Sequence, residues 1–492
     1  MKNKFRVMAM ILAVLMLAMS FVACQNNEND PDTTSATNNS TPVTSSNGDS
    51  TSTPATTTDN EINLDDYAFV WVKPTHSATG RANMAPDNET ELGIQLTDIY
   101  NEIEDRYNCT IEINQTMGTD FEALMPSAVG GVKYADAVCT RQSNWIPLAM
   151  MGGLRALDSQ EMLDAGLDLY NENVFNQIYT QMTNVKGKIW GFDMSGIYDN
   201  IAMGHCYAFN KRIVENAGYP AEVIFDAVRN GTWTYDYFLE IARACVSDPA
   251  GDGLTYPVGD DIWGIALDGD GNEIWTNGTG PIVYDEATGK YLSNLTDPQL
   301  IKAMEFMAAV NGEGDLMVPE AHGSVPKRGD RRQIFYEGKA AFAGLYGGNF
   351  NDSNTGLMED DFGVVPFPKG PDTDKYIINM VDLDSSIIMT SNTDYAKTAV
   401  ILNAIGEKVT DFEAYKELVL ESFRGCEDSV DVLFNYAFPN AFMNIAKCSS
   451  EMHEIMRKQL YSDIYTKNMS VAQAAETYTG KIQAELDGIF RQ

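Results

Sequence analysis

The chain has 492 residues, of which 44% are hydrophobic and 10% aromatic, enough to build more than one hydrophobic core. It carries 70 acidic residues against 34 basic ones, a formal net charge of −36 at pH 7. A surface this negative repels phosphate backbones and anionic lipid headgroups, which argues against nucleic-acid and peripheral membrane binding. Anionic ligands are disfavoured unless a local basic pocket accommodates them, whereas neutral ligands remain possible.

The N-terminus has the pattern of a secretory signal. Three basic residues within the first six precede an apolar run over residues 7–19, which is not a transmembrane span of the mature protein. The Ser-Phe-Val-Ala stretch before Cys24 is similar to a bacterial lipobox, in which the cysteine is acylated and becomes the new N-terminus. We expect residues 1–23 to be a lipoprotein signal peptide and the lipid on Cys24 to hold the protein at the extracytoplasmic face of the cell membrane. The alternative makes Cys24 an ordinary residue near a cleavage site.

The segment after Cys24 is almost wholly Ser, Thr, Asn, Asp and Pro. Residues 25–60 contain no Lys or Arg and only three apolar side chains, so they cannot bury enough surface to offset the entropy of ordering. We expect residues 24–62 to be a disordered tether that, as a flexible chain, spans roughly 30 Å.

Six further cysteines follow, with no CxxC pair. An extracytoplasmic site permits disulfides. Three of them, Cys109, Cys139 and Cys206, lie in apolar, strand-like runs where a buried free thiol is the commoner case. Cys426 and Cys448 flank a loop-and-helix stretch and are the pair we expect, if any pair forms.

The body opens with strand-like and helix-like patterns in alternation. Apolar residues at every third or fourth position from Leu92 to Tyr107 predict an amphipathic helix, and Asp120 is placed to cap a helix that begins at Phe121. The expected strands are residues 68–72, 109–113 and 135–140, and a third helix is expected from residue 144. Such alternation predicts a parallel sheet that gathers ligands at the carboxyl ends of its strands. The loops expected there are residues 73–83, 116–120 and 140–145.

The second half of the chain is also mixed in pattern. Thr234 is a candidate cap for a helix, and Pro298 stands in the favoured first-turn position of another. Near the end, Ser470 and Gln473 fit a capping box in front of a long apolar stripe.

Several of these segments, in this order, resemble the solute-binding proteins of ABC importers, in particular the large sugar-binding branch, family 1. The resemblance is carried by a strand, loop and helix over residues 136–158, by Tyr-Ala-Phe-Asn-Lys at 207–211, by Gly-Thr-Trp-Thr at 231–234, by Phe-Tyr-Glu-Gly-Lys-Ala-Ala-Phe at 335–342 and by the strand at 362–368. Each motif alone is weak, whereas their order and spacing together are specific.

The resemblance implies an α/β periplasmic-binding-protein-like fold of two lobes joined by hinge strands, with a ligand cleft that closes between them. Lobe 1 would comprise residues 63–198 plus 385–408, and lobe 2 residues 199–384 plus 409–492 with the C-terminal helices. The hinge crossings would fall near residues 194–208 and 382–386. The implied partners are a small-molecule sugar or oligosaccharide ligand and the permease subunits in the membrane, with the protein itself a monomer.

A sugar cleft needs flat aromatic faces and side chains that hydrogen-bond hydroxyl groups. The candidate ligand-binding residues are Arg141, Asn144, Trp145, Trp190 and Tyr198 in the first lobe, and Asn272, Glu273, Trp275, Tyr346 and Asn349 in the second. Trp145 is alternatively a core residue of the following helix, and Trp190 and Tyr198 are equally compatible with strand packing. The family often has Trp where this chain has Leu345-Tyr346-Gly-Gly-Asn349, which weakens the case for ring stacking there.

Signatures of chemistry are missing from the sequence. The four histidines are far apart, and there is no G-x-S-x-G, phosphate-binding loop or H-E-x-x-H motif. The acidic loops at residues 248–253 and 268–272 lack the Gly and Glu spacing of an EF-hand, and Asx turns explain both more simply. We therefore expect no cofactor, metal or catalytic residue.

The sequence thus predicts a lipid-anchored binding protein that captures a sugar or oligosaccharide for an ABC importer. The alternatives are an extracellular carbohydrate-active enzyme, in which two of the many carboxylates form a glycosidase pair, a binding protein for a peptide or other small solute, and a sensor subunit without transport.

Overall fold

The computed structural model describes residues 62–74, 84–198, 203–255, 259–267, 271–312, 316, 331–380, 383–465 and 469–491. The predicted signal peptide, Cys24 and nearly all of the predicted tether lie outside the described residues. Residues 61–492 form one compact unit.

The first sheet has five strands in the order β2-β1-β3-β14-β6. They are β1 (Tyr67–Val72), β2 (Cys109–Asn114), β3 (Ala137–Arg141), β6 (Gly191–Phe192) and β14 (Asp384–Ile387). The first three are parallel, as the alternating pattern predicts, whereas β14 runs antiparallel to both β3 and β6. We call this sheet and the helices packed on it lobe 1.

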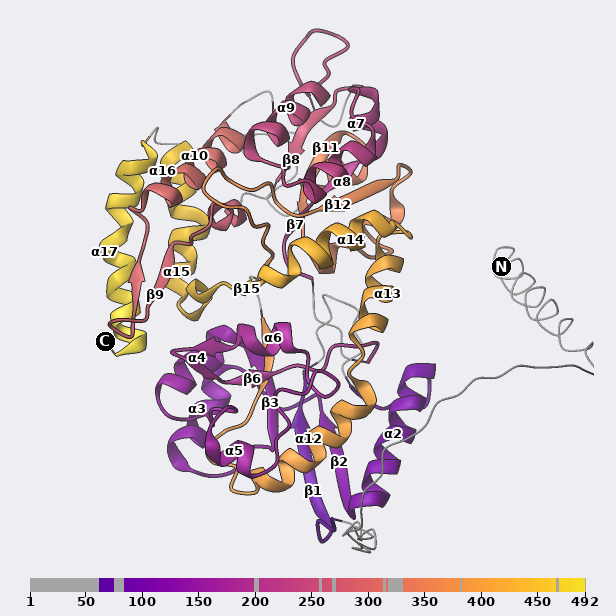
Figure 1. Ribbon diagram of the computed structural model, residues 1–492, viewed down its shortest axis with the longest axis vertical. Helices are drawn as coiled ribbons and strands as arrows, with labels where there is room; N and C mark the ends of the chain where they lie inside the picture. Colours follow the sequence, from indigo (N-terminus) through magenta and orange to yellow (C-terminus); the bar gives the residue numbers. More distant parts are fainter. Residues whose placement is uncertain are drawn as a thin grey trace, which may run out of the picture. The chain divides into compact units, whose positions relative to one another are not determined.

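Both faces of this sheet are covered because the side chains of β1 alternate. Phe69 and Trp71 pack with α2 (Glu91–Tyr107) and α12 (Tyr395–Val409), and Val72 packs on the other face with α3 (Phe121–Gly130) and α4 (Gln142–Met150). Figure 1 shows α12, from late in the sequence, lying among these early elements.

The second sheet has the order β12-β7-β11-β8, and with its helices it forms lobe 2. Its strands are β7 (Cys206–Asn210), β8 (Trp263–Ala266), β11 (Ala340–Leu345) and β12 (Phe362–Val365). An aromatic core of Tyr207, Trp233, Phe238 and Phe342 packs it against its helices. Those helices are α7 (Lys211–Asn216), α8 (Ala221–Arg229), α9 (Tyr235–Cys245), α11 (Arg332–Tyr336), α13 (Phe412–Ser422) and α14 (Glu427–Tyr436).

Two short pairings link the chain where it passes between the sheets. His205, directly before β7, bridges to Asn379 of β13 (Asn379–Met380), and β13 pairs in parallel with β15 (Phe442–Met443). This places three distant chain segments side by side next to the crossing.

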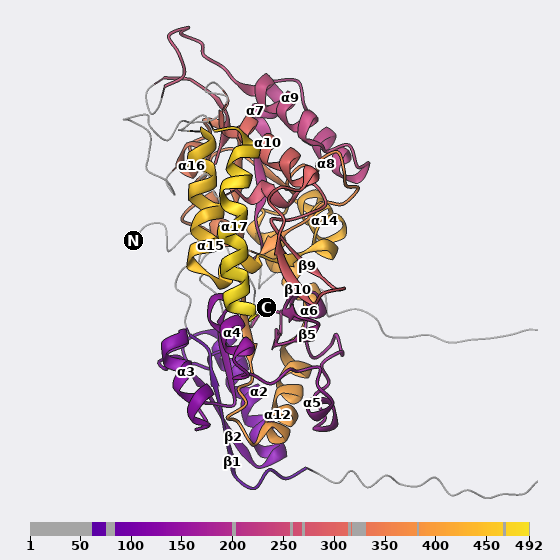
Figure 2. The same cartoon turned by 90° about the vertical axis from the view of Figure 1, so that its left-hand side faces the viewer.

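The C-terminal elements pack against one another and against lobe 1. Figure 2 shows α15 (Ser450–Glu454), α16 (Leu460–Tyr465) and α17 (Val471–Phe490) side by side, with the hairpin β9 (Ile282–Asp285) and β10 (Lys290–Ser293) next to α17. The apolar cluster inside them also includes Trp145 of α4. The remaining elements are α5 (Gln160–Asp164), α6 (Gln177–Met182), β4 (Asn184–Val185), β5 (Lys188–Ile189), η1 (Asn272–Trp275), α10 (Pro298–Gly312), η2 (Gly347–Asn349), η3 (Thr355–Leu357), η4 (Phe438–Asn440), η5 (Ile445–Cys448) and η6 (Ile455–Gln459).

Local capping follows the sequence closely. Asp120 accepts a hydrogen bond from the backbone N–H of Ala123, and Ser470 and Gln473 form the predicted capping box of α17. Thr234 occupies the predicted cap position of α9 but makes no side-chain capping bond. Asp248 accepts hydrogen bonds from the N–H groups of Gly251 and Gly253, so an Asx-type turn accounts for that acidic loop.

All six cysteines of the described chain are free, so Cys426 and Cys448, the pair expected if any formed, do not pair. Cys426 lies at the start of α14 in lobe 2, where the Ser429 hydroxyl donates to its sulfur at 3.1 Å. Cys448 ends η5 and is buried in the other cluster, with α4 and α17. Their separate packing environments explain why they do not pair. In the part of the chain that the structure covers, no helix is long and apolar enough to cross a membrane.

Candidate functional site

Four side chains from separate segments meet beside the crossing between the lobes. The rings of His205 and Tyr346 lie 5.5 Å apart between centroids. The amide nitrogen of Asn272 is 3.0 Å from His205 Nδ1, and the amide of Asn379 donates to Asn272 Oδ1 at 3.4 Å. We call His205, Asn272, Tyr346 and Asn379 the polar cluster.

Strand register explains how these residues come together. Leu345 of β11 pairs with Cys206 of β7, so the next residues outward, Tyr346 and His205, continue the same register. His205 bridges to Asn379, and Asn379 pairs with Phe442. Because directly paired residues point to the same face of a sheet, these side chains share one face.

The short helix η1 lies beside the polar cluster. Gly271, with φ 69°, makes the turn into η1 in a conformation that favours glycine. Asn272 begins the helix and touches the polar cluster, whereas Trp275 ends it and packs against Phe442, with ring centroids 5.8 Å apart and planes inclined by 42°.

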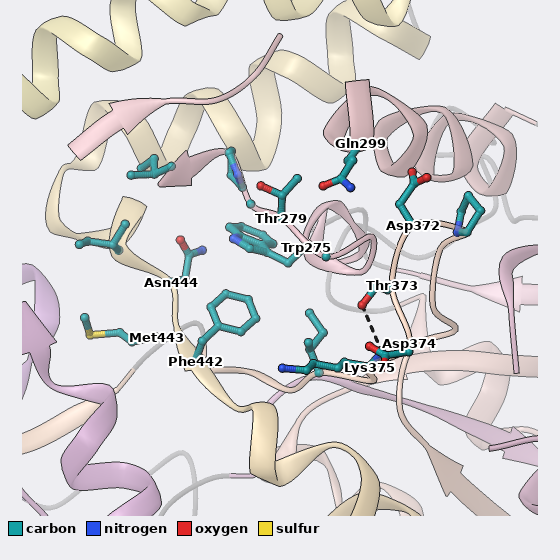
Figure 3. A pocket seen from close by; sticks show the side chains of 17 residues that line it. Trp275, Thr279, Gln299, Asp372, Thr373, Asp374, Lys375, Phe442, Met443 and Asn444 are labelled. Atoms are coloured by element: carbon teal, nitrogen blue, oxygen red, sulfur yellow. Dashed lines mark hydrogen bonds between the residues drawn. The ribbon is translucent and has the colours of Figure 1, made fainter. Parts of the chain in front are cut away.

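A pocket of about 890 Å³ opens at the Trp275–Phe442 pair (Figure 3). We call it the aromatic pocket. Its polar lining consists of Thr279, Gln299, Asp372, Thr373, Asp374, Lys375 and Asn444. Two aromatic rings surrounded by hydroxyl, amide and carboxylate groups are suited to a ligand that has both apolar faces and hydroxyl edges.

The charged side chains at this pocket differ in whether they already have a partner within the protein. Lys302 Nζ lies 2.8 Å from Asp372, whose carboxylate also accepts from Asn277 at 2.8 Å, and these interactions, led by Lys302, lower the pKa of Asp372. Asp372 is therefore a fixed negative charge. Among the described residues, the side chains of Asp374 and Lys375 make no hydrogen bond or ion pair, so they remain available to a ligand.

A second pocket, of about 600 Å³, adjoins the first. It shares Phe442, Met443, Ile282 and Ile445 with the aromatic pocket and is also lined by residues of α6. α6 contacts β6 of the lobe 1 sheet, whereas its Tyr179 and Met182 pack with the apolar core of lobe 2, so this pocket lies where the two lobes meet.

Five of the ten candidate residues lie in this region. Asn272 and Tyr346 belong to the polar cluster, and Trp275 lines the aromatic pocket. Asn349 lies next to Tyr346, and its Oδ1 accepts a 3.1 Å hydrogen bond from the backbone N–H of Tyr346. Glu273 is buried and accepts a 2.9 Å hydrogen bond from the hydroxyl of Tyr207, so it faces the interior of lobe 2.

Arg141 and Asn144 lie at the carboxyl end of β3, as expected. Arg141 is exposed, with its Nε 3.5 Å from Asp384 Oδ1, and Asp384 begins β14, the strand that follows β13 in the chain. Asn144 donates to the carbonyl of Thr119 at 3.2 Å. Both side chains are therefore at the lobe 1 end of the same crossing.

The three other aromatic candidates are packing residues in this structure. Trp145 has no exposed surface and lies in the apolar cluster shared by α4 and the C-terminal helices. Trp190 is also buried, with its indole N–H donating to the carbonyl of Val185. Tyr198 is partly exposed and donates to Gln95 at 2.7 Å. Trp145 and Trp190 are therefore buried in apolar surroundings. The sequence pattern does not distinguish such a core position from the wall of a cleft.

Sequence reasoning missed His205, Asn379 and Phe442. None lies in a motif; their proximity results from a strand bridge and a two-residue pairing between segments far apart in the chain. The available signal was that His205 lies within one segment expected to cross between the lobes and Asn379 lies just before the other, whereas the sequence offered no signal for Phe442.

Comparisons with known proteins agree with this architecture. A cyclo/maltodextrin-binding protein in complex with maltotetraose is similar at a TM-score of 0.56 and 14% identity, covering 85% of this chain and 97% of its own. A cyclic α-maltosyl-1,6-maltose binding protein from Arthrobacter globiformis is similar at 0.55 and 14%, covering 86% and 100%. The chain has the fold of the ABC-transporter solute-binding proteins.

The same fold occurs with other ligands. UgpB from Mycobacterium tuberculosis, in complex with glycerophosphocholine, is similar at a TM-score of 0.52 and 16% identity, covering 86% of this chain and 98% of its own. No family model matches the sequence, and no curated protein matches it significantly. The predicted two-lobed α/β fold class is confirmed, whereas the ligand has to be argued from the residues at the site.

Proposed function

We propose that this protein captures a sugar or oligosaccharide between its lobes and delivers it to the permease of an ABC importer. Binding would be coupled to hinge closure, which is a shift between two states favoured by a ligand that contacts both lobes. The protein would perform no chemistry on its ligand.

The observation that carries this proposal is the position of the aromatic pocket beside the polar cluster. Trp275 and Phe442 present ring faces of the kind that pack on pyranose rings, while Asn272, Tyr346 and Gln299 offer uncharged groups for hydroxyls. Sugar-binding solved structures of the same fold support this reading.

A second candidate function is capture of another small solute, because the fold also accommodates glycerophosphocholine in UgpB. A phosphodiester would need a cationic partner, and among the described residues Lys375 is the one basic side chain that lines the aromatic pocket. Two carboxylates on the same lining, Asp372 and Asp374, disfavour that ligand relative to a neutral sugar.

A thermal-shift screen tests the proposal. A ligand at 100 times its Kd adds about 2.7 kcal/mol to the free energy of unfolding, which raises the melting temperature measurably. Neutral saccharides should raise it, whereas peptides and glycerophosphocholine should not. A shift with peptides or glycerophosphocholine and none with saccharides would reject the substrate class.

We also propose that the lipid on Cys24 and the tether hold the protein at the outer face of the cell membrane, near its permease. The support comes from the sequence, where the basic start, apolar run and cysteine are followed by a polar segment. We also propose that the protein is a monomer, and this proposal rests on the resemblance of the sequence to the sugar-binding family.

A further inference from the structure

The two lobes are connected by packed side chains as well as by the chain that crosses between them. The connection is made by β9, β10, α10, η5 and α15–α17, which we call the C-terminal unit. Building on the proposed function, we propose that a turn of lobe 1 and the end of α17 form a clasp that controls how fast the ligand enters and leaves. The clasp is the contact of Lys186 with Tyr291 and with the carbonyl of Phe490.

The C-terminal unit is attached to lobe 2 through α10. Phe306 of this helix belongs to the apolar core of lobe 2, whereas its neighbour Met307 belongs to the cluster of the C-terminal helices. The ring of Phe306 stacks on Tyr235 of α9, with centroids 3.8 Å apart and planes inclined by 2°. Both rings are buried, so separating them would expose a large apolar area to water. The unit therefore stays with lobe 2 when the lobes move.

Lobe 1 reaches the C-terminal unit with a short hairpin. β4 and β5 form this hairpin, with Lys186 and Gly187 as its two turn residues, and β5 leads directly towards β6 of the lobe 1 sheet. Both turn residues have positive φ, 56° and 72°. Such a turn favours Asn-Gly, because other side chains rarely adopt positive φ. A lysine at this position indicates that its side chain has a role of its own.

The Lys186 side chain reaches the C-terminal end of α17. Its Nζ donates at 3.1 Å to the carbonyl of Phe490, one of the last carbonyls of the helix, which have no partner within it. Positive charge is favourable at this end of a helix, yet the last turn contains Asp487 and no basic residue, and Arg491 follows only as the cap. Lobe 1 therefore supplies a cation that the last turn of α17 lacks.

The same turn touches the hairpin beside α17. The backbone N–H of Lys186 donates to the Tyr291 hydroxyl at 3.4 Å, and the ring centroids of Tyr291 and Phe490 lie 4.3 Å apart. Figure 2 shows β10, which carries Tyr291, next to α17. One turn of lobe 1 thus holds two elements of the C-terminal unit at once.

The clasp borders the second pocket, which adjoins the aromatic pocket. Ile282 and Tyr291 of the hairpin line one side of this pocket, and Asn184 of β4 lines another, together with α6. Because a space of about 600 Å³ separates these sides, little apolar area holds them together across it. Release of the clasp would let them move apart and would give a ligand a path to the aromatic pocket.

The contact of α4 with the C-terminal unit would serve as the pivot. α4 packs against η5 and α17, and Trp145 on this helix has no exposed surface. Exposing a buried indole costs more free energy than breaking a hydrogen bond that water can replace. The lobes would therefore rotate about α4 while the turn at Lys186 moves away from α17.

Hydrogen exchange of the ligand-free mature chain, followed by mass spectrometry, tests the clasp without any ligand. Lys186→Asn removes the ammonium and keeps a residue that tolerates positive φ. It should speed amide exchange in β10 and in the last turn of α17 at least threefold, because both lose their contact with lobe 1. Lys186→Arg keeps a cation and should restore most of the protection.

Lys188→Asn is the matched control. Lys188 is exposed on the same hairpin, and its ammonium lies over the Trp190 ring of lobe 1, 5.9 Å from the centroid. This variant removes the same charge and should leave exchange in β10 and α17 unchanged. Unchanged exchange in Lys186→Asn, or an equal effect of Lys188→Asn, would overturn the clasp and leave the proposed function standing.

Stopped-flow binding of the saccharide that gives the largest thermal shift tests what the clasp controls. Lys186→Asn should raise the association and dissociation rate constants by the same factor, at least threefold. The Kd should stay within twofold, because Lys186 lines neither pocket. A changed Kd with unchanged rates would overturn the control of ligand exchange. Absence of binding to every saccharide would overturn the proposed function and this control with it, whereas the exchange experiment would still decide whether the clasp exists.

Discussion

Asn379 and Phe442 are paired directly across β13 and β15 and point to the same face of this two-stranded ladder. Through this pairing, a buried amide that touches the polar cluster stands next to a ring that lines the aromatic pocket. The two halves of the candidate site are therefore adjacent because of backbone pairing, although Asn379 and Phe442 lie in separate segments of the sequence.

Trp145 should be important for stability. Trp145→Ala leaves a large cavity between α4 and the C-terminal helices and should cost about 3–5 kcal/mol in the free energy of unfolding, measured by urea denaturation. Trp145→Phe should cost less, since the indole N–H makes no hydrogen bond in the described structure and only ring volume is lost. A Trp145→Ala protein with unchanged stability and weakened ligand binding would instead support a role in the cleft.

Gly204 should tolerate no side chain. A Cβ at this position would lie 2.3 Å from Ile378 Cγ2 and 2.7 Å from the carbonyl oxygen of Asn379, so the crossing would have to move. Gly204→Ala should destabilise the protein by about 1–3 kcal/mol and weaken ligand binding. Gly480→Ala is the matched control: it meets open space on α17 and should be neutral or stabilising by up to about 1 kcal/mol. Equal effects of the two changes would contradict the argument.

The comparison of sequence with structure shows where pattern reasoning succeeds. The first two strands, the helix that begins at Phe121, the cap by Asp120 and the capping box at Ser470 were predictable because each depends on neighbours within a few residues. The polar cluster was predictable only in part. Asn272 and Tyr346 lie in recognisable segments, whereas His205 and Phe442 join them through pairings across more than 60 residues of chain. Trp145 and Trp275 were both predicted to bind the ligand, and their burial in the folded chain separates their roles.

Acid should weaken lobe 2 through Asp360. The Arg212 guanidinium donates to this carboxylate at 2.8 Å and, with Asn210, lowers its pKa. Because the folded-state pKa lies below the unfolded value of about 3.9, the stabilisation is present above that pH and is lost as the pH falls through the folded pKa. Asp360→Asn should therefore lower stability at pH 6 and make little difference near pH 2, measured by denaturant unfolding at each pH.

A double-mutant cycle with Arg212→Met separates this pair from other effects. Once Arg212 is replaced, Asp360→Asn should cost less at pH 6 than it does in the wild type. A stability difference between wild type and Asp360→Asn that does not change with pH would contradict the assignment.

Cys24→Ser should release the protein from the membrane. Without the thiol there is no site for the lipid, so the proposed anchor is lost and the protein should move from the membrane fraction to the soluble fraction in cell fractionation. Ligand affinity should not change, because Cys24 lies outside the folded unit of residues 61–492. Retention in the membrane fraction would show that another element anchors the chain.

The central claim is capture of a saccharide without chemistry. Its most direct test is calorimetric titration of the mature protein with the neutral saccharide that gives the largest thermal shift, followed by chromatographic recovery of that saccharide. We predict binding of one ligand per chain and recovery of the saccharide intact after prolonged incubation. Absence of binding at millimolar concentrations, or recovery of shorter products, would contradict the account.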